Sequence, residues 1–184
     1  MSEICLLGLP IGNLEDITQR VLVALRDGKF FIVEDTRSFK KLLGLLGISL
    51  QDKILYTLHD QNQESVEKLL EKIKNKRTYL VSDAGSSIIS DPAYPLLKEA
   101  IKNNFVLETY PGVSSVLAAL ELSGLPPVPF TFHGFSKRSS GNRQSDLKCL
   151  SPGTHIFFES PHRIQEFMQA LSRVFPESQV SVSR

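Results

Sequence analysis

The stretch that decides the fold is "RTYLVSDAGSSIISDPAYPLL", residues 77–97. It begins with a strand-like run, Thr78–Val81, continues with the small residues of Ser82–Ser87, and leads into an expected helix, Pro92–Asn103. In the small-residue part, little side-chain bulk stands between the backbone and whatever approaches it. The stretch therefore predicts a strand–loop–helix unit, and what needs so little side-chain bulk in its loop stays open at this point.

The same alternation of strand and helix is repeated along the first half of the chain. A helix is expected over residues 63–75, where apolar side chains recur at i, i+3, i+4 and i+7. The other expected elements are the strands Ile4–Leu9, Phe30–Val33 and Phe105–Thr109 and the helices Glu15–Arg26 and Ser38–Leu46. Repeated alternation of this kind predicts an α/β fold in which helices pack on a mostly parallel sheet.

The composition changes after Tyr110. Residues 111–129 contain four prolines and two glycines, which is typical of a junction between domains. We therefore expect an N-terminal α/β domain over residues 1–110 and a partial C-terminal α/β domain over residues 111–184, which looks truncated. The second part is expected to contain the helices Ser115–Ser123 and Pro161–Val174 and the strands Val128–His133, His155–Phe158 and Val180–Val182.

The totals narrow the class of protein. The chain has 184 residues, of which 41% are hydrophobic and 22% are charged, an ordinary globular composition. Its apolar runs are far shorter than the roughly 20 residues of a membrane span. Cys5 and Cys149 form no CxxC pair, which fits a reducing compartment, and we expect a cytoplasmic protein. With a net charge of +1, any contact with nucleic acid must be local.

The first loop, Gly8–Gly12, does not match a dinucleotide site. Its glycines are spaced G-x-x-x-G, Pro10 interrupts it, and no P-loop lysine follows. Glu15 and Asp16 are expected in the first helical turn, where a pyrophosphate would need a positive helix end. The loop suits a cationic or neutral ligand better. The alternative is that it only caps a helix, with Asn13 as the N-cap.

Acidic residues and arginine follow the second strand, as Glu34, Asp35 and Arg37. They could form a substrate-side catalytic cluster at the carboxyl edge of the sheet. The alternative is that Asp35 caps the next helix while Arg37 pairs with Glu34.

A second polar group, Glu159 to Arg163, follows a later strand. Ser160 and Pro161 are good residues for an N-cap and a first helical position. Glu159 and His162 are candidate catalytic residues beside them. The four histidines lack ligand spacing, so no metal is expected, and no G-x-S-x-G motif indicates a hydrolase.

A basic segment, Lys137–Arg143, is expected to be a flexible loop. Within residues 137–148 there are four cations against Asp146. The segment is either a solvated loop or a contact for the phosphates of a nucleic acid.

Six motifs together are more specific than any one of them: "LPIGNLEDIT", "EDTR", "VSDAGSSIISDPAYPLL", "YPGVSSVLAAL", "FHGFSKRSSG" and "FESPHR". In this order they resemble the small-subunit ribosomal RNA 2′-O-methyltransferases that act on a decoding-site cytidine, within the tetrapyrrole methylase superfamily. The resemblance implies two α/β domains, S-adenosylmethionine in the cleft between them, ribosomal RNA as partner and a homodimer. Ser86-Ser87, Ala93 and Gly8-Leu9 depart from the residues usual in the family.

The resemblance also implies roles for individual residues. The implied cofactor-binding residues are Gly8, Pro10, Gly12, Ser82, Asp83, Ala84, Gly85, Ser87, Ile88, Pro111, Gly112 and Ser114. The expected RNA-binding residues are Lys137, Arg138, Arg143 and Arg163. Asp83 would lie near the cationic part of the cofactor, and Asp91 is expected mainly to start a helix.

The expected reaction is attack of a ribose 2′-oxygen on the sulfonium methyl carbon, helped by a base. The cluster of Glu34, Asp35 and Arg37 is expected near the acceptor ribose, and Glu159 and His162 are second candidates. Which residue is the base stays open. Two other functions are considered. One is a methylase of the same superfamily that acts on a tetrapyrrole or on diphthine. The other is a catalytically silent RNA-binding or ribosome-assembly protein.

Overall fold

The computed structural model describes residues 1–58, 63–89 and 93–184. By their internal contacts, these residues form two compact units, Met1–Ser114 (unit 1) and Ser115–Arg184 (unit 2), and each is described by itself. The predicted division into domains at residues 110 and 111 stays a prediction. Among the described residues, no helix is both long and apolar enough to cross a membrane.

Unit 1 is built on a five-stranded sheet whose order is β3-β2-β4-β1-β5. All its strand pairs are parallel, as the alternation of elements predicted. The strands are β1 (Glu3–Leu7), β2 (Phe30–Val33), β3 (Ile54–Thr57), β4 (Arg77–Val81) and β5 (Val106–Tyr110). Strand β3 was missed because it lies at an edge and is only half-buried, so it lacks the continuous apolar run of the central strands.

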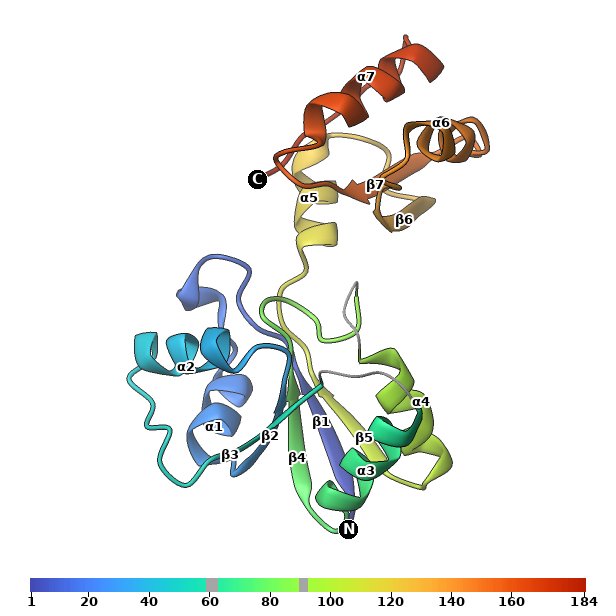
Figure 1. The fold of residues 1–184 in the computed structure, drawn as a ribbon. Coiled ribbons are helices and arrows are strands. Elements are labelled where there is room, and N and C mark those ends of the chain that lie inside the picture. Colours follow the sequence, from blue (N-terminus) through green and yellow to red (C-terminus); the bar gives the residue numbers. More distant parts are fainter. Residues whose placement is uncertain (59–62, 90–92) are drawn as a thin grey trace. The chain divides into compact units, whose positions relative to one another are not determined.

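Two pairs of helices cover the two faces of this sheet (Figure 1). The pair α1 (Gln19–Asp27) and α2 (Thr36–Leu45) packs on one face, and the pair α3 (Gln63–Ile73) and α4 (Tyr94–Lys102) packs on the other. Successive strand residues point to opposite faces, so Leu80 lies in one apolar cluster and Val81 in the other. The sheet is therefore buried on both sides, as expected for parallel strands.

The strand order determines where the connections diverge. The chain moves toward the β3 edge after β1 and β2, and toward the β5 edge after β3 and β4. Right-handed crossovers then place the two pairs of helices on opposite faces. The connections that leave β2 and β4, which are neighbours, run in opposite directions. The carboxyl ends of these two strands are thus the point where a ligand can approach the sheet.

The predicted start of α1 was wrong. Glu15 and Asp16 belong to a short 3₁₀ turn, η1 (Leu14–Asp16), and Asn13 caps this turn by accepting a hydrogen bond from the Glu15 N–H at 3.2 Å. The α-helix begins only at Gln19, where the Thr18 hydroxyl accepts from the Val21 N–H at 3.3 Å. The two acids therefore lie outside the first turn of α1.

Unit 2 has three helices and two parallel strands among its described residues. They are α5 (Ser115–Ser123), β6 (Phe130–Phe135), α6 (Ser140–Lys148), β7 (Thr154–Phe158) and α7 (Ile164–Val174). Leu147 of α6 packs with Phe167 and Ala170 of α7. Three predictions fail here. Residues 140–143 of the expected flexible loop Lys137–Arg143 belong to α6, residues 180–182 are exposed and not a strand, and α7 begins at Ile164 without a side-chain cap from Ser160.

Candidate functional site

Three loops of unit 1 are joined at the carboxyl edge of its sheet. They follow β1, β4 and β5, which are neighbours in the order β4-β1-β5. The Gly8 N–H donates to the Tyr110 carbonyl at 2.9 Å. Leu9 and Gly85 exchange two backbone hydrogen bonds, of 2.8 and 3.2 Å. The predicted cofactor-binding residues of all three loops are thus brought to one edge.

Close backbone contact explains several of the glycines without a ligand. A Cβ on Gly8 would lie 2.5 Å from the Gly112 nitrogen, and a Cβ on Gly112 would lie 2.6 Å from the Gly8 oxygen. Gly85 has a φ of +67°, which side chains other than hydrogen adopt only with strain. Their small size is required first by the contact between loops.

The buried serines of the β4 loop also serve the loop itself. Ser82 donates to the Ala84 carbonyl at 3.1 Å. Ser87 is 3% exposed and its hydroxyl lies 3.4 Å from the Leu7 carbonyl and 3.3 Å from the Leu80 carbonyl. Beside these serines, between β2 and β4, lies a hollow of about 10 Å³, which has room for roughly one water molecule. This hollow does not hold an adenosine.

Two exposed carboxylates stand next to this hollow. The Asp83 N–H donates to Glu34 Oε2 at 3.3 Å, so the loop after β4 is tied to the end of β2. The Ser38 hydroxyl, in the first turn of α2, donates to Asp83 Oδ2 at 3.3 Å. Ser38 was not among the site residues predicted from the sequence, although a polar residue in the first turn of a helix that follows a strand is a signal that could have found it.

Asp35 and Arg37 bind each other. Asp35 Oδ1 accepts from the Arg37 N–H at 2.7 Å and caps α2, and Asp35 Oδ2 lies 2.9 Å from Arg37 Nη2. These hydrogen bonds to Arg37 lower the pKa of Asp35 to about 2. The alternative with Asp35 as a helix cap is present in the structure. Its second part is wrong, because Arg37 pairs with Asp35 and not with Glu34.

The other candidate catalytic residues belong to unit 2. The Glu159 side chain is only 3% exposed and its oxygens are occupied. It accepts from the Ser136 hydroxyl and, at 2.7 Å, from the Ser160 N–H, and it lies 2.5 Å from Arg163 Nη2. Both oxygens of this carboxylate are therefore already engaged by donors of unit 2. His162 is exposed. Within the described residues, neither unit by itself brings Glu34, Asp35 and Arg37 together with Glu159 and His162.

The four predicted RNA-binding cations differ in access. Arg143 is only 3% exposed, and its contact with RNA stays a prediction. Arg163 is held by Glu159, and Lys137 lies 3.2 Å from Asp146. Arg138 is exposed.

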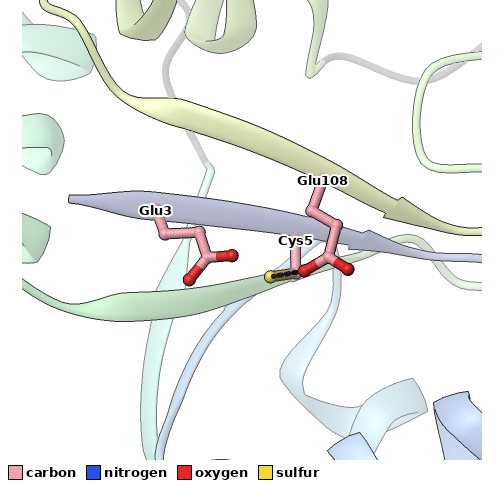
Figure 2. Close-up of side chains that lie close together, drawn as sticks. All are labelled: Glu3, Cys5 and Glu108. Atoms are coloured by element: carbon pink, nitrogen blue, oxygen red, sulfur yellow. Dashed lines mark hydrogen bonds between the residues drawn. The ribbon is translucent and has the colours of Figure 1, made fainter. Parts of the chain in front are cut away.

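A further charged cluster on the sheet was not found from the sequence. Glu3 and Cys5 of β1 point toward Glu108 of β5 (Figure 2), with one ligand atom from each within 4.8 Å of the others. The residues are brought together by the register of β1 and β5, which places Cys5 opposite Glu108.

This cluster has the chemistry of an ion-pair network. Arg77 lies 2.8 Å from Glu108 and 3.6 Å from Glu3, and Arg20 also binds Glu108 at 2.8 Å. Burial, followed by the nearby Glu3 carboxylate, raises the pKa of the Cys5 thiol to about 12. At neutral pH the thiol is therefore protonated and faces Glu108 at 3.6 Å. Two arginines balance the two acids, so the group does not need a cation.

The residues at the carboxyl edge fit a small cationic cofactor in their chemistry. Glu34 and Asp83 offer exposed carboxylates on neighbouring strand ends, and Ala84, Pro111 and Gly112 are exposed residues of the loops after β4 and β5. Of the twelve predicted cofactor residues, Gly8, Gly112, Ser82, Ser87 and Gly85 are used by the loops themselves. Gly12, Asp83, Ala84, Ile88 and Pro111 are exposed, Pro10 is buried and Ser114 is half-buried. Asp91 lies outside the described residues.

The chain is similar in sequence to two proteins that carry the same name. Over 97% of its length it is 38% identical to the "Ribosomal RNA small subunit methyltransferase I" of Halalkalibacterium halodurans, of which it spans 62%. Over 100% of its length it is 35% identical to the protein of the same name from Thermotoga maritima, of which it spans 83%. The chain spans less than two thirds of the first of these relatives. Both matches confirm the resemblance inferred from the six motifs.

Solved structures share the fold at low sequence identity. A cobalt precorrin-4 methyltransferase superposes with a TM-score of 0.64 at 15% identity, covering 94% of this chain and 75% of that one. A diphthine synthase superposes with a TM-score of 0.62 at 17% identity, covering 95% and 72%. The predicted fold class, α/β of the tetrapyrrole methylase type, is confirmed. Since the family model described as Tetrapyrrole (Corrin/Porphyrin) Methylases matches residues 3–183, the chain belongs to this family.

Proposed function

We propose that this chain acts as an S-adenosylmethionine-dependent methyltransferase that methylates the 2′-oxygen of a cytidine ribose in small-subunit ribosomal RNA. The observation that carries the proposal is its 35–38% identity, over nearly the whole chain, to relatives named as small-subunit ribosomal RNA methyltransferases. Ribosomal RNA is the partner in this proposal. In this proposal the protein acts in the cytoplasm as a homodimer and has two domains, residues 1–110 and residues 111–184.

The cofactor is assigned to the carboxyl edge of the unit 1 sheet. When bound there, S-adenosylmethionine would supply a methyl group on a positively charged sulfur. Asp83 and Glu34 would offset that charge, because opposite charges within about 4–6 Å stabilise each other. The exposed backbone of the loops after β4 and β5 would supply hydrogen-bonding groups to its neutral parts.

The chain's own residues would contribute to the reaction in two ways. They would place the ribose oxygen in line with the methyl carbon, and they would remove the proton of that oxygen. Holding the ribose oxygen in line with the methyl carbon could lower the barrier by roughly 7–11 kcal/mol. A base would add about 10²- to 10⁴-fold in rate. Glu34 is the preferred base, because only Oε2 of its exposed carboxylate has a hydrogen-bond donor among the described residues. Asp35 is disfavoured because Arg37 contacts both of its oxygens, and His162 is the second candidate.

Transfer of a labelled methyl group tests the proposal. The chain is incubated with small-subunit particles and S-adenosylmethionine labelled at the methyl carbon, and the modified nucleotide is mapped. We expect label on a cytidine 2′-oxygen, and a loss of about 10²-fold or more with Glu34→Gln. Glu71→Gln is the matched control, because Glu71 is a 72% exposed side chain on the surface of α3. Label on a base atom, on a tetrapyrrole or on a protein residue would contradict the assigned acceptor.

One observation favours a second function, that of a silent RNA-binding protein. In unit 1 the loops after β1 and β5 are packed on each other, and the hollow between the ends of β2 and β4 has a volume of only about 10 Å³. RNA binding without methyl transfer and without cofactor binding would support this alternative.

A further inference from the structure

We propose that residues 136–138 of unit 2, which we name the clamped loop, form a phosphate-contact site in which Arg138 touches RNA while Arg143 and Arg163 hold the loop in place. The inference rests on the proposed function, since the ligand is the phosphodiester backbone of RNA. It changes the roles of residues that the sequence analysis treated as one set of equivalent cations.

Three consecutive carbonyl groups of the clamped loop face guanidinium groups. Arg163 Nη1 donates to the Ser136 carbonyl at 3.4 Å. Arg143 donates from Nε to the Lys137 carbonyl at 3.1 Å and from Nη2 to the Arg138 carbonyl at 3.3 Å. Two arginines thus fix the direction of three successive peptide groups.

Arg143 acts inside the unit and is out of reach of a phosphate. Its side chain is 3% exposed, and its third partner is Glu166 at 3.5 Å. Helix α6 puts it in this position, because the Arg143 N–H donates to the Ser139 carbonyl at 2.9 Å in the first turn. A buried guanidinium is costly unless its donors are paired, and here the loop carbonyls and Glu166 pair them.

Arg163 is held just as firmly from the other side. It lies 2.5 Å from Glu159, whose side chain is 3% exposed. Glu159 also accepts from the Ser136 hydroxyl, so the first residue of the loop is fixed by its side chain and by its carbonyl. The loop therefore has anchors that come from both α6 and the turn after β7.

The side chains that remain accessible are Lys137 and Arg138. Lys137 lies 3.2 Å from Asp146, and both side chains are at least half exposed. Arg138 is exposed and, in the part of the chain that the structure describes, its guanidinium has no hydrogen-bond or ion-pair partner. A guanidinium matches the paired oxygens of a phosphate with two parallel hydrogen bonds. Holding the loop rigid beforehand lowers the entropy lost when RNA binds.

A solvated loop without a ligand is the alternative. It accounts for an exposed Arg138. It does not explain why two arginines and a glutamate with a buried side chain hold the backbone of three residues in place. The two explanations differ in one respect that can be measured. In the proposal, Arg143 affects RNA binding only through Arg138.

Binding of small-subunit ribosomal RNA to the 184-residue chain, measured over a series of salt concentrations, tests this. Arg138→Gln is expected to weaken binding and to reduce the slope of log K against log salt by about 1. Arg143→Lys keeps the charge but not the planar fork that spans two carbonyls, so it is expected to weaken binding as well. The double variant is expected to bind no more weakly than Arg138→Gln alone, because both changes remove the same contact.

Arg173→Gln is the matched control, since it removes another exposed arginine from the same unit, and it is expected to leave the slope within error of the wild type. Provided that the wild type binds RNA, either of two results would overturn the inference. One is that the losses of binding free energy in the double variant add up, and the other is that the salt slope of Arg138→Gln is unchanged. If the wild type fails to bind at low salt, the proposed function falls together with it. Arg138→Gln changes an exposed side chain, so this arm does not depend on whether Arg143→Lys folds.

Discussion

Gly8 and Gly112 face each other across the carboxyl ends of β1 and β5, and this contact determines which residues both loops can contain. The nearest backbone atom would lie 2.5 Å from a Cβ at Gly8, whereas a Cβ at Gly44 in α2 would meet nothing within 4 Å. The family resemblance implies that both Gly8 and Gly112 are cofactor-binding residues. Sequence alone cannot distinguish backbone that approaches a ligand from backbone that approaches other backbone.

Replacing Gly8 by alanine is expected to destabilise the protein by at least about 1–3 kcal/mol, since the added methyl group would overlap the backbone of Gly112. Chemical denaturation measures the free energy of unfolding. The control Gly44→Ala should instead stabilise the protein by roughly 0.5–1 kcal/mol, because Gly44 lies inside a helix. Equal effects of the two variants would contradict the close contact.

Asp35 should make stability depend on pH in a defined range. Its pKa is lowered from 3.8 to about 2 in the folded protein, chiefly by hydrogen bonds from Arg37. A lowered pKa in the folded state means that the carboxylate stabilises the protein above the unfolded pKa, and that this contribution is lost as the pH falls toward 2.

We therefore expect the difference in unfolding free energy between the wild type and Asp35→Asn to be constant above pH ~5 and to shrink as the pH falls from 3.8 to about 2. Denaturation at a series of pH values measures it. A difference that stays the same down to pH ~2 would show that the Asp35–Arg37 pair does not form in solution.

At the scale of elements, the sequence predicted the central strands and most helices because their apolar residues follow the periods of buried structure. It failed where burial is partial. Strand β3 is a half-buried edge, and α6 is a polar helix in which Leu147 is buried against α7. The start of α1 was misplaced because Asn13 and Thr18 both cap turns, and only the second of these turns continues as an α-helix.

Strand β4 contains one position that can be improved. Thr78 is fully buried, and its hydroxyl has no hydrogen-bond partner in the structure of residues 1–58, 63–89 and 93–184. Thr78→Val keeps the shape, removes the unpaired hydroxyl and suits a strand. We expect thermal and chemical denaturation to show a gain of about 1 kcal/mol. A loss of similar size would mean that the hydroxyl has a partner in solution.

At the scale of the whole molecule, the part of the site that could be predicted is the part that topology dictates. Parallel strands bring the ends of β1, β4 and β5 to one edge, so their loops meet whatever their sequences. What could not be predicted is which charged side chains bind other groups of the chain and which remain exposed. Arg143 and Arg138 look alike in the sequence, yet one is buried against carbonyls and the other is exposed. Glutamate is a common catalytic residue type, but the contacts of Glu159 with Ser160 and Arg163 are those of a carboxylate held in place inside unit 2.

The proposed function requires that the carboxyl edge of the unit 1 sheet bind a sulfonium cofactor through its exposed carboxylates. Calorimetric titration of S-adenosylmethionine into the 184-residue chain and into Asp83→Asn tests it most directly. Asp52→Asn is the control, since Asp52 is an exposed acid just before β3, at the other edge of the sheet. We predict binding to one site that weakens roughly 10- to 100-fold in Asp83→Asn and is unchanged in Asp52→Asn. Absence of binding to the wild type, or equal affinity for the wild type and Asp83→Asn, would contradict the account.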